Sequence, residues 1–420
     1  MAQPLFEDLL WRGLVHSVTP ELEKELDAGG LTLYYGCDPT ADSLHIGHLL
    51  GLVTLGRFQT AGHRPIALVG GGTGLVGDPG SEERPLLSIE EVKANVVGIR
   101  EQVERFVDFD AGGELVDNLD WLGTVGLMEF LRDVGKYVTV NTMIAKDSVR
   151  TRLEEREQGI SFTEFTYQLL QAYDFMQLFD RHDCRLQIGG SDQWGNITAG
   201  VDLIRKVRSE QVHALVWPLI TIGGEKMGKT AGNAVWLDAK RTSPYHLYQF
   251  FFRTEDADVG NFLRAYTHLS REQIEELDVE TESRPEQRQA QRLLAAEVTT
   301  MVHGESETAR AQRVSEVLFT EEVASLDEQT LVDVLRDAPS STRRRSDLDG
   351  DGLPLVDALA GAQLVRSKAA ARTTISQGGA YLNNRRQDDV DRRLTREDLI
   401  ANRYILLRRG KREQHLLRFA

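Results

Sequence analysis

Two histidines three residues apart are the first candidates for chemistry. They end the run Asp38-Pro39-Thr40-Ala41-Asp42-Ser43-Leu44-His45-Ile46-Gly47-His48. The spacing places both imidazoles on one side of a predicted helix start, which Asp42 or Ser43 can cap. The free N–H groups of a helix N-terminus favour a phosphate, and Gly47 lets a ligand approach the backbone closely. The pair therefore indicates a phosphate site whose imidazoles stabilise developing charge. Two helix-surface histidines or a zinc site are the alternatives, although no third ligand follows at zinc-like spacing.

A second candidate is the run Gly223-Gly224-Glu225-Lys226-Met227-Gly228-Lys229-Thr230. Two lysines among glycines suit a loop that closes over a triphosphate, where Lys229 would neutralise charge on a leaving pyrophosphate. The run lacks the Gly-x-x-x-x-Gly-Lys-[Ser/Thr] spacing of a P-loop. Taken alone, it is equally typical of a basic surface loop.

A third candidate is a polar stripe on a largely apolar segment. Tyr167, Gln171 and Asp174 fall at i, i+4 and i+7 and so share one face of a predicted helix. Each polar group left unpaired in an apolar setting costs about 1–3 kcal/mol. A solvent-facing stripe is the alternative, but surfaces usually carry Lys and Glu instead. We therefore expect the stripe to meet a polar ligand.

The elements that position these candidates alternate between strands and helices. Residues 31–35 and 65–69 predict strands on either side of a helix over 44–60, and a further strand is expected at 185–188. Strand, helix, strand at this spacing is a βαβ unit of a parallel sheet. Such sheets bind ligands beyond the carboxyl ends of their strands, so we expect chemistry after Tyr35, Val69 and Ile188. Helical patterns cover 88–107, 126–157 and 243–335.

Composition and the chain's start bound the class of protein. A chain of 420 residues suits about two to four domains. Two cysteines, Cys37 and Cys184, are too few for a disulfide framework or a four-thiolate zinc site. The acidic N-terminus is not a signal peptide, and the longest apolar stretch, near 49–58, is too short to span a bilayer. These features predict a cytoplasmic protein without a membrane segment.

The charge is distributed unevenly along the chain. The net charge is −16, yet residues 361–420 hold 14 Lys/Arg against 6 Asp/Glu. A basic C-terminal module on an acidic body favours docking on phosphates, and a solvated basic tail is the alternative. The polar stretch 339–351 lacks periodicity and is expected to be a linker before a compact unit at 352–420.

Together, His45-Ile46-Gly47-His48 and Lys226-Met227-Gly228-Lys229-Thr230 resemble the two signatures of class I aminoacyl-tRNA synthetases, in the expected order. The third and fifth positions of the second run depart from the generic signature, although both lysines and a hydroxyl remain. The resemblance implies an α/β fold with a Rossmann-like parallel-sheet catalytic domain. It also implies ATP as a substrate, carried with Mg²⁺, and no metal held by the protein.

The resemblance sharpens to the tyrosyl-tRNA synthetases of bacterial type and covers essentially the whole chain. It is carried by Tyr34-Tyr35-Gly36-Cys37-Asp38-Pro39-Thr40, by the polar stripe and by Leu186-Gln187-Ile188-Gly189-Gly190-Ser191-Asp192-Gln193-Trp194-Gly195-Asn196. It implies that Tyr34 and Asp174 bind the phenolic hydroxyl of L-tyrosine. Tryptophan is the nearest competing substrate, but its indole is too wide for a phenol slot.

The same resemblance implies roles for further positions. Tyr167, Gln171 and Asp78 would hold the α-ammonium group, and Gln193 would lie near the carboxyl group. Asp192 and the Gly190 backbone would bind the ribose. The implied catalytic set is His45, His48, Thr40, Lys226, Lys229 and Thr230, and the implied ATP-binding set is Gly36, Asp38, Gly47, Gly190, Asp192 and Lys229.

The resemblance also implies a domain order and partners. The expected catalytic domain covers 1–225, with a helical dimerisation insertion near 120–160 and a homodimer as its consequence. An α-helical domain for the anticodon stem of tRNA(Tyr) would cover 226–338. The module at 352–420 resembles the small α+β S4-type RNA-binding domain, in which Arg366, Lys368 and Arg372 would face phosphates.

Two other functions remain open on the sequence. One is an RNA-binding protein with a silent catalytic half, against which the intact signature residues argue. The other is a different nucleotidyltransferase with a His-x-Gly-His motif. The C-terminal module and the Tyr34/Asp174 pair argue against that second alternative.

Overall fold

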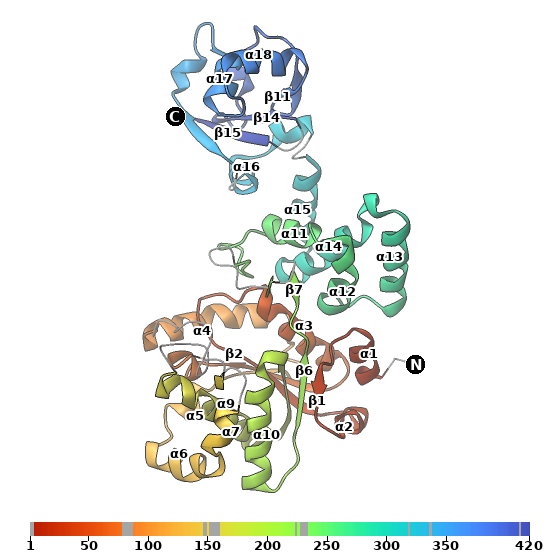
Figure 1. Ribbon diagram of the computed structural model, residues 1–420, viewed down its shortest axis with the longest axis vertical. Helices are drawn as coiled ribbons and strands as arrows, with labels where there is room; N and C mark the ends of the chain where they lie inside the picture. Colours follow the sequence, from red (N-terminus) through yellow and green to blue (C-terminus); the bar gives the residue numbers. More distant parts are fainter. Residues whose placement is uncertain are drawn as a thin grey trace. The chain divides into compact units, whose positions relative to one another are not determined.

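The computed structural model divides the chain into two compact units, shown in Figure 1. One unit comprises Met1–Thr242 and Phe250–Val302, and the other comprises Ser243–Gln249 and His303–Ala420. The structure describes residues 4–77, 87–145, 149–150, 160–222, 225–226, 234–317, 320–335, 338–410 and 413–420, with the backbone alone at 222, 225, 226 and 321. Among the helices so described, none is both long enough and apolar enough to cross a membrane.

A six-stranded sheet forms the centre of the first unit, in the order β1-β6-β5-β2-β3-β4. All neighbours are parallel except the edge strand β1, which is antiparallel to β6. The strands are β1 (Ser17–Val18), β2 (Thr32–Cys37), β3 (Arg64–Val69), β4 (Glu114–Asp117), β5 (Cys184–Gly190) and β6 (His213–Trp217). Strand β2 lies between β5 and β3. The strand order therefore reverses at β2, because β3 and β4 follow on one side of it and β5 and β6 on the other. Sheets of this kind bind ligands in the crevice at such a reversal, beyond the carboxyl ends of the strands.

Alternating side chains of β2 decide which helices cover which face of this sheet. Tyr34 packs in one cluster with residues of α9 (Phe162–His182) and α10 (Trp194–Arg208). Tyr35 points the other way, to α3 (Ile46–Thr60), where a Cβ on Gly51 would lie only 2.3 Å from its ring. The buried strands are thus covered on both faces, as a parallel sheet requires.

The elements expected around the candidate residues are confirmed. Strands β2, β3 and β5 and helices α3 and α9 lie where the sequence predicts them, and α4 (Ile89–Val103) covers most of the helix expected at 88–107. The helical pattern predicted over 126–157 is confirmed in its described part, although it is divided into short helices. It contains α6 (Leu127–Asp133) and α7 (Val140–Ile144), separated by a 3₁₀ turn, because several of its apolar residues are exposed and no continuous apolar face holds a long helix to the core. The other short helices here are α1 (Leu5–Trp11), α2 (Leu22–Ala28) and α5 (Leu119–Leu122).

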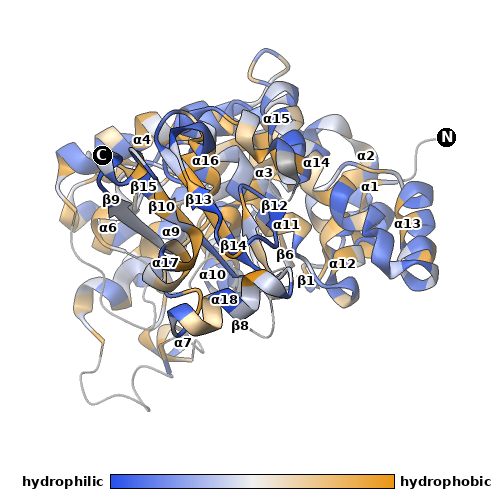
Figure 2. Cartoon of the chain, turned by 90° about the horizontal axis from the view of Figure 1, so that it is seen from above, coloured by the Kyte–Doolittle hydropathy of each residue, from blue (hydrophilic) through white to orange (hydrophobic). Residues whose placement is uncertain are grey.

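The region predicted to be helical after residue 243 is confirmed as helical. Its helices are α11 (Pro244–Phe252), α12 (Asp256–Tyr266), α13 (Arg271–Ser283), α14 (Gln289–His303), α15 (Glu305–Val317) and α16 (Glu328–Val334). Figure 2 shows the hydrophilic colour prevailing on α13, whose buried positions are only Ile274 and Leu277. Helix α13 is therefore attached to its unit by a narrow apolar stripe.

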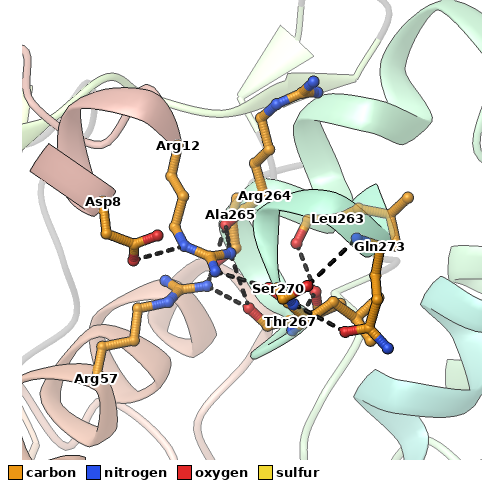
Figure 3. Close-up of polar contacts among 10 residues, drawn as sticks. Asp8, Arg12, Arg57, Leu263, Arg264, Ala265, Thr267, Ser270 and Gln273 are labelled. Carbon is orange, nitrogen blue, oxygen red and sulfur yellow. Dashed lines mark hydrogen bonds and ion pairs between the residues drawn. The ribbon is translucent and has the colours of Figure 1, made fainter. Parts of the chain in front are cut away.

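Two buried arginines attach the end of α12 to α1 and α3 (Figure 3). Arg57 of α3 donates to the carbonyl oxygens of Arg264, Ala265 and Thr267 at 2.7–3.1 Å. Arg12 donates to three carbonyl oxygens of the same turn and to Asp8. Cations at a helix C-terminus satisfy its unpaired carbonyls and its partial negative charge. The Arg57 contacts thereby hold the C-terminal end of α3, the helix whose N-terminal end carries the signature histidines.

The C-terminal part of the second unit is built on a five-stranded sheet, in the order β12-β11-β14-β15-β9. The strands are β9 (Ser340–Arg343), β11 (Ala380–Leu382), β12 (Arg385–Gln387), β14 (Tyr404–Arg409) and β15 (Glu413–Phe419), packed with α17 (Leu355–Gly361) and α18 (Lys368–Ser376). The α+β module expected here is present. The prediction of a linker at 339–351 is wrong at its start, where the chain forms β9 and pairs in parallel with β15. This pairing uses backbone groups, so the pattern of side chains does not reveal it.

Candidate active site

Helix α9 delivers the polar stripe to the carboxyl end of the sheet. Its start is set by a capping box, in which Ser161 Oγ accepts from Glu164 N and the Glu164 carboxylate accepts from Ser161 N. The apolar residues of the helix pack against the sheet and so turn Tyr167 and Asp174 inward, where both are buried. The stripe is therefore not solvent-facing at these two positions.

Asp174 is a buried carboxyl group, 2% exposed, that accepts hydrogen bonds from two side chains. Asn118 Nδ2 donates to its Oδ2 at 2.9 Å, and Trp121 Nε1 donates to its Oδ1 at 2.7 Å. Burial raises the pKa of Asp174 to about 7, although these two hydrogen bonds oppose the shift. A carboxylate oxygen offers more than one acceptor direction, so Asp174 can accept a further donor.

Tyr34 lies beside this carboxyl group. Its hydroxyl is fully buried and has no hydrogen-bond partner among the described residues. Burial raises the pKa of Tyr34 well above its ordinary value, and the nearby Asp174 raises that pKa further. A buried hydroxyl without a partner is rare in proteins, and here it indicates a place for the polar group of a ligand.

A chain of hydrogen bonds runs from Asp174 to the end of β2. Asn118 Nδ2, which donates to Asp174, also donates to Thr73 Oγ1 at 2.9 Å. Thr73 Oγ1 donates to Asp38 Oδ1 at 2.7 Å, and Tyr167 Oη donates to Asp38 Oδ2 at 2.9 Å. Thr73 Oγ1 both accepts from Asn118 and donates to Asp38, so the two carboxylates are linked in one network of hydrogen bonds.

Glycines after β3 let backbone and carboxylates approach each other. A Cβ on Gly70 would lie 2.2 Å from Asp38 Oδ1, and a Cβ on Gly71 would lie 2.2 Å from Asp117 Oδ1. Asp117 Oδ1 accepts from Gly71 N and from Leu119 N. Burial raises the pKa of Asp117. The expected loop after Val69 is thus part of the site's wall.

The signature histidines stand at the N-terminus of α3. His45 is the cap residue, its Nδ1 accepts from Gly47 N at 3.0 Å, and His48 Nδ1 accepts from His45 N at 3.3 Å. A ring nitrogen that accepts carries no proton, so the neutral form of each imidazole holds its proton on Nε2. The two rings are 4.1 Å apart. Both side chains are therefore set to donate through Nε2.

The remaining predicted residues lie around this network or outside the described part. Gln193 accepts from Asn196 through Oε1 at 2.9 Å, and Thr40 N donates to the Asp38 carbonyl. Gly36, Gly190, Asp192 and Gln171 are at the ends of β2 and β5 and on α9, as expected. Asp78, Lys229 and Thr230 lie outside the described residues, and Lys226 is described only by its backbone, in β8 (Glu225–Lys226).

Asn118, Trp121 and Thr73 were missed by the sequence analysis. Asn118 directly follows β4, so the rule for carboxyl ends of parallel strands applies to it. The signal was weak, because β4 is only four residues long and none of them is fully buried. Among the described residues, no group of three or more His, Cys, Asp or Glu side chains is arranged to hold a metal ion.

The predicted RNA-binding residues are exposed on the C-terminal module. Ser367 caps α18 by accepting from Ala370 N, and Lys368 and Arg372 follow one turn apart on that helix. Lys368 Nζ lies 2.9 Å from Asp357 Oδ1, so part of its charge is already balanced. Arg366 precedes the helix and is also exposed.

Comparison with known families identifies both parts of the chain. Residues 27–320 match the family model "tRNA synthetases class I (W and Y)". Residues 327–417 match the "Tyrosine--tRNA ligase SYY-like C-terminal domain". The first match covers more than half of the chain and contains every described residue of the network above.

Individual relatives agree over the full length. A tyrosine–tRNA ligase of Roseiflexus castenholzii is 54% identical over 420 residues, which cover 99% of each chain. One of Geobacillus stearothermophilus is 48% identical and covers 99% of this chain and 100% of its own. The solved mitochondrial tyrosyl-tRNA synthetase of Aspergillus nidulans, truncated at its C-terminus, is 32% identical, covers 76% of this chain and 95% of its own, and superposes with a TM-score of 0.69. The chain belongs to the tyrosine–tRNA ligase family of class I aminoacyl-tRNA synthetases.

Proposed function

We propose that the chain activates L-tyrosine with ATP at the network described above and transfers the tyrosyl group to the 3′-terminal adenosine of tRNA(Tyr). The observation that carries this proposal is the pair formed by Tyr34, a buried hydroxyl without a partner in the described residues, and Asp174, a buried carboxyl held by two donors. A phenolic hydroxyl between them donates to Asp174 and pairs with Tyr34. Phenylalanine would leave both polar groups unpaired, which is costly in a dry pocket.

The other end of the network suits the backbone end of the amino acid. Asp38 and Tyr167 present acceptor oxygens toward the end of β2, as binding of an α-ammonium group requires. We assign Gln171 and Asp78 to the same group and Gln193 to the carboxylate side. This orientation places the substrate carboxylate toward Gly190 and Asp192, where the ribose of ATP is assigned.

Activation then needs positioning and charge stabilisation. The tyrosine carboxylate oxygen forms a bond to the α-phosphorus as the bond to the bridging oxygen breaks, and pyrophosphate leaves with the electron pair. His45 and His48 donate through Nε2 to the phosphate oxygens as charge develops, and Lys226, Lys229 and Thr230 are assigned to the leaving group. Thr40 is assigned beside them. Mg²⁺ enters with ATP.

Tyrosine-dependent exchange of pyrophosphate into ATP tests this function. Purified protein with ATP, Mg²⁺ and L-tyrosine is expected to support exchange, and L-tryptophan is expected to support none. Absence of exchange with L-tyrosine would disprove the proposal and favour a silent RNA-binding protein. Exchange that needs no amino acid would favour another nucleotidyltransferase.

Binding of L-tyrosine is expected to depend on pH through Asp174. The ionised carboxylate accepts a hydrogen bond from the phenol, and burial raises the pKa of Asp174 to about 7 before the ligand binds. Lowering the pH from 8 to 6 should therefore raise the dissociation constant about tenfold, because only the ionised fraction is competent. Equilibrium dialysis without ATP measures this and avoids titration of the nucleotide. Asp174→Asn should bind weakly with no dependence on pH in this range. A wild-type dissociation constant that stays the same between pH 8 and pH 6 would show that the Asp174 carboxylate does not accept this hydrogen bond.

We infer that the chain acts as a homodimer through α6, α7 and the start of α9. Apolar side chains there are 41–78% exposed, namely Leu127, Met128, Leu131, Val140, Ile144 and Phe162. A patch of this kind marks an interface more often than a free surface. Met128→Asp combined with Phe162→Asp should yield a monomer in sedimentation equilibrium. Val279→Asp, at an exposed apolar position on α13, should leave the mass unchanged.

The remaining assignments concern tRNA and location. We place the anticodon stem on the helices after residue 243 and phosphate contacts at Arg366, Lys368 and Arg372, which are exposed on the basic module. Both cysteines are free thiols, which suits the reducing cytoplasm to which we assign the protein.

A further inference from the structure

The backbone around the first signature histidine is paired with a distant segment. Ile46 N donates to the carbonyl of Val235 at 3.0 Å, and Leu237 N donates to the carbonyl of Leu44 at 2.8 Å. These bonds make an antiparallel bridge between His45 and Trp236. The side chains of these two residues therefore stand next to each other.

The indole of Trp236 meets the imidazole of His45 edge to face. The ring centroids are 6.0 Å apart and the ring planes are inclined by 72°. This is a favoured geometry for two aromatic rings, since the edge of one is positive and the face of the other negative. One nitrogen of His45 is already held by Gly47 N, so a contact on the ring itself restricts its remaining rotation.

Trp236 is in turn held by a charged pair. The guanidinium of Arg241 lies over the indole at 4.6 Å from its centroid, and Arg241 Nη2 lies 2.5 Å from Asp42 Oδ1. Asp42 is three residues before His45, and Trp236 N donates to Thr242 Oγ1 at 2.9 Å. The contacts run from Asp42 through Arg241 and Trp236 to His45, and the backbone between Asp42 and His45 closes them into a ring of contacts. Surface pairs contribute little to stability, so this ring fixes geometry more than it stabilises the fold.

We propose that Trp236, held by Arg241 and Asp42, is a positioning residue that sets the plane of the His45 imidazole for tyrosine activation. The direction of the Nε2–H bond follows the ring plane, and a donor helps a transition state only when it points at the oxygen on which charge develops. Trp236 touches no substrate in this proposal and acts only through His45. The inference rests on the role proposed for His45.

A double-mutant cycle tests whether Trp236 acts through His45. Trp236→Leu should lower kcat of tyrosine activation about tenfold and leave KM for L-tyrosine unchanged. In a His45→Ala background the same substitution should change kcat less than about twofold, because its target is gone. An equal loss in both backgrounds would overturn the proposal. No loss in His45→Ala alone would instead refute the role of His45, so the two failures are distinguishable.

Arg241 supplies a version of the test that leaves the Trp236 side chain itself intact. Arg241→Ala should lower kcat by about threefold, again only when His45 is present, and Arg241→Lys should restore part of it. The matched control is Arg271→Ala, because Arg271 lies over Trp11 at 5.3 Å and pairs with Glu275 at similar exposure, outside the site. The control should leave kcat unchanged. An equal effect of both arginine substitutions would also overturn the proposal.

Discussion

Asp174→Ala is expected to lower kcat/KM for L-tyrosine about 10³-fold in the exchange assay. The change removes the acceptor for the substrate hydroxyl and also leaves Asn118 Nδ2 and Trp121 Nε1 without their bond to Asp174. Each unpaired buried group costs about 1–3 kcal/mol. Asn118 and Trp121 lose their bonds to Asp174 in the free variant as well, so they do not count in kcat/KM. The lost hydrogen bond to a charged acceptor and the unpaired substrate hydroxyl account for the expected size, since about 1.4 kcal/mol is tenfold in rate.

The effect should be confined to the amino acid. KM for ATP is expected to change less than about threefold, because Asp174 lies at the opposite end of the network from the ribose assignment. Asp180→Ala is the control, since it removes an exposed carboxylate of the same helix that pairs with Arg208. Equal losses for tyrosine and ATP would show that Asp174 has a different role. Asp174→Asn, which keeps the shape but not the charge, should lose less than Asp174→Ala.

His45→Ala is expected to lower kcat of activation about 10²–10³-fold, the usual loss when one preorganised donor to a developing oxyanion is removed. KM for L-tyrosine should stay the same, because the interaction is made only in the transition state. The structure gives the reason for a donor role, since Gly47 N occupies Nδ1 and leaves the proton on Nε2. Rapid-quench measurement of a single turnover separates this step from product release.

The control and the opposite outcome are simple for this variant. His16 is exposed and its ring bonds to the neighbouring Ser17 hydroxyl, so His16→Ala should keep full activity. A rise in KM for L-tyrosine with kcat unchanged would place His45 in ground-state binding instead. His48→Ala should resemble His45→Ala, and it should also disturb His45, whose N–H donates to the His48 ring.

The identity of the amino acid depends on a few side chains and not on the fold. The family model covers both the tryptophan and the tyrosine enzymes, whereas the full-length relatives are tyrosine–tRNA ligases. Structures under 20% identical, such as the Plasmodium falciparum tryptophanyl enzyme with a TM-score of 0.52, share the same architecture. The fold alone therefore does not decide between the two amino acids, and the proposal assigns the discrimination to the Tyr34 and Asp174 pair.

Local patterns in the sequence determined the elements and many of the candidate residues. Strands β2, β3 and β5, helices α3 and α9, and the face shared by Tyr167 and Asp174 all follow from periodicity, which is a property of neighbouring residues. The start of α3 near residue 45 follows from the same local rules, but the prediction that Asp42 or Ser43 caps it is wrong, because the side chain of His45 itself accepts from Gly47 N. The resemblance of short motifs then named the reaction and the substrate.

Only the tertiary structure decided which distant residues meet. The order β5-β2-β3-β4 brings Asn118 and Trp121 to Asp174, and the bridge at residues 235–237 brings Trp236 to His45. Strand order and backbone pairing depend on the packing of the whole sheet, and no spacing along the chain encodes them. The same reason explains β9, whose partner β15 lies more than seventy residues away along the chain. The sequence thus supplied the candidate groups for the proposed chemistry, and the fold decided which side chains hold them in place.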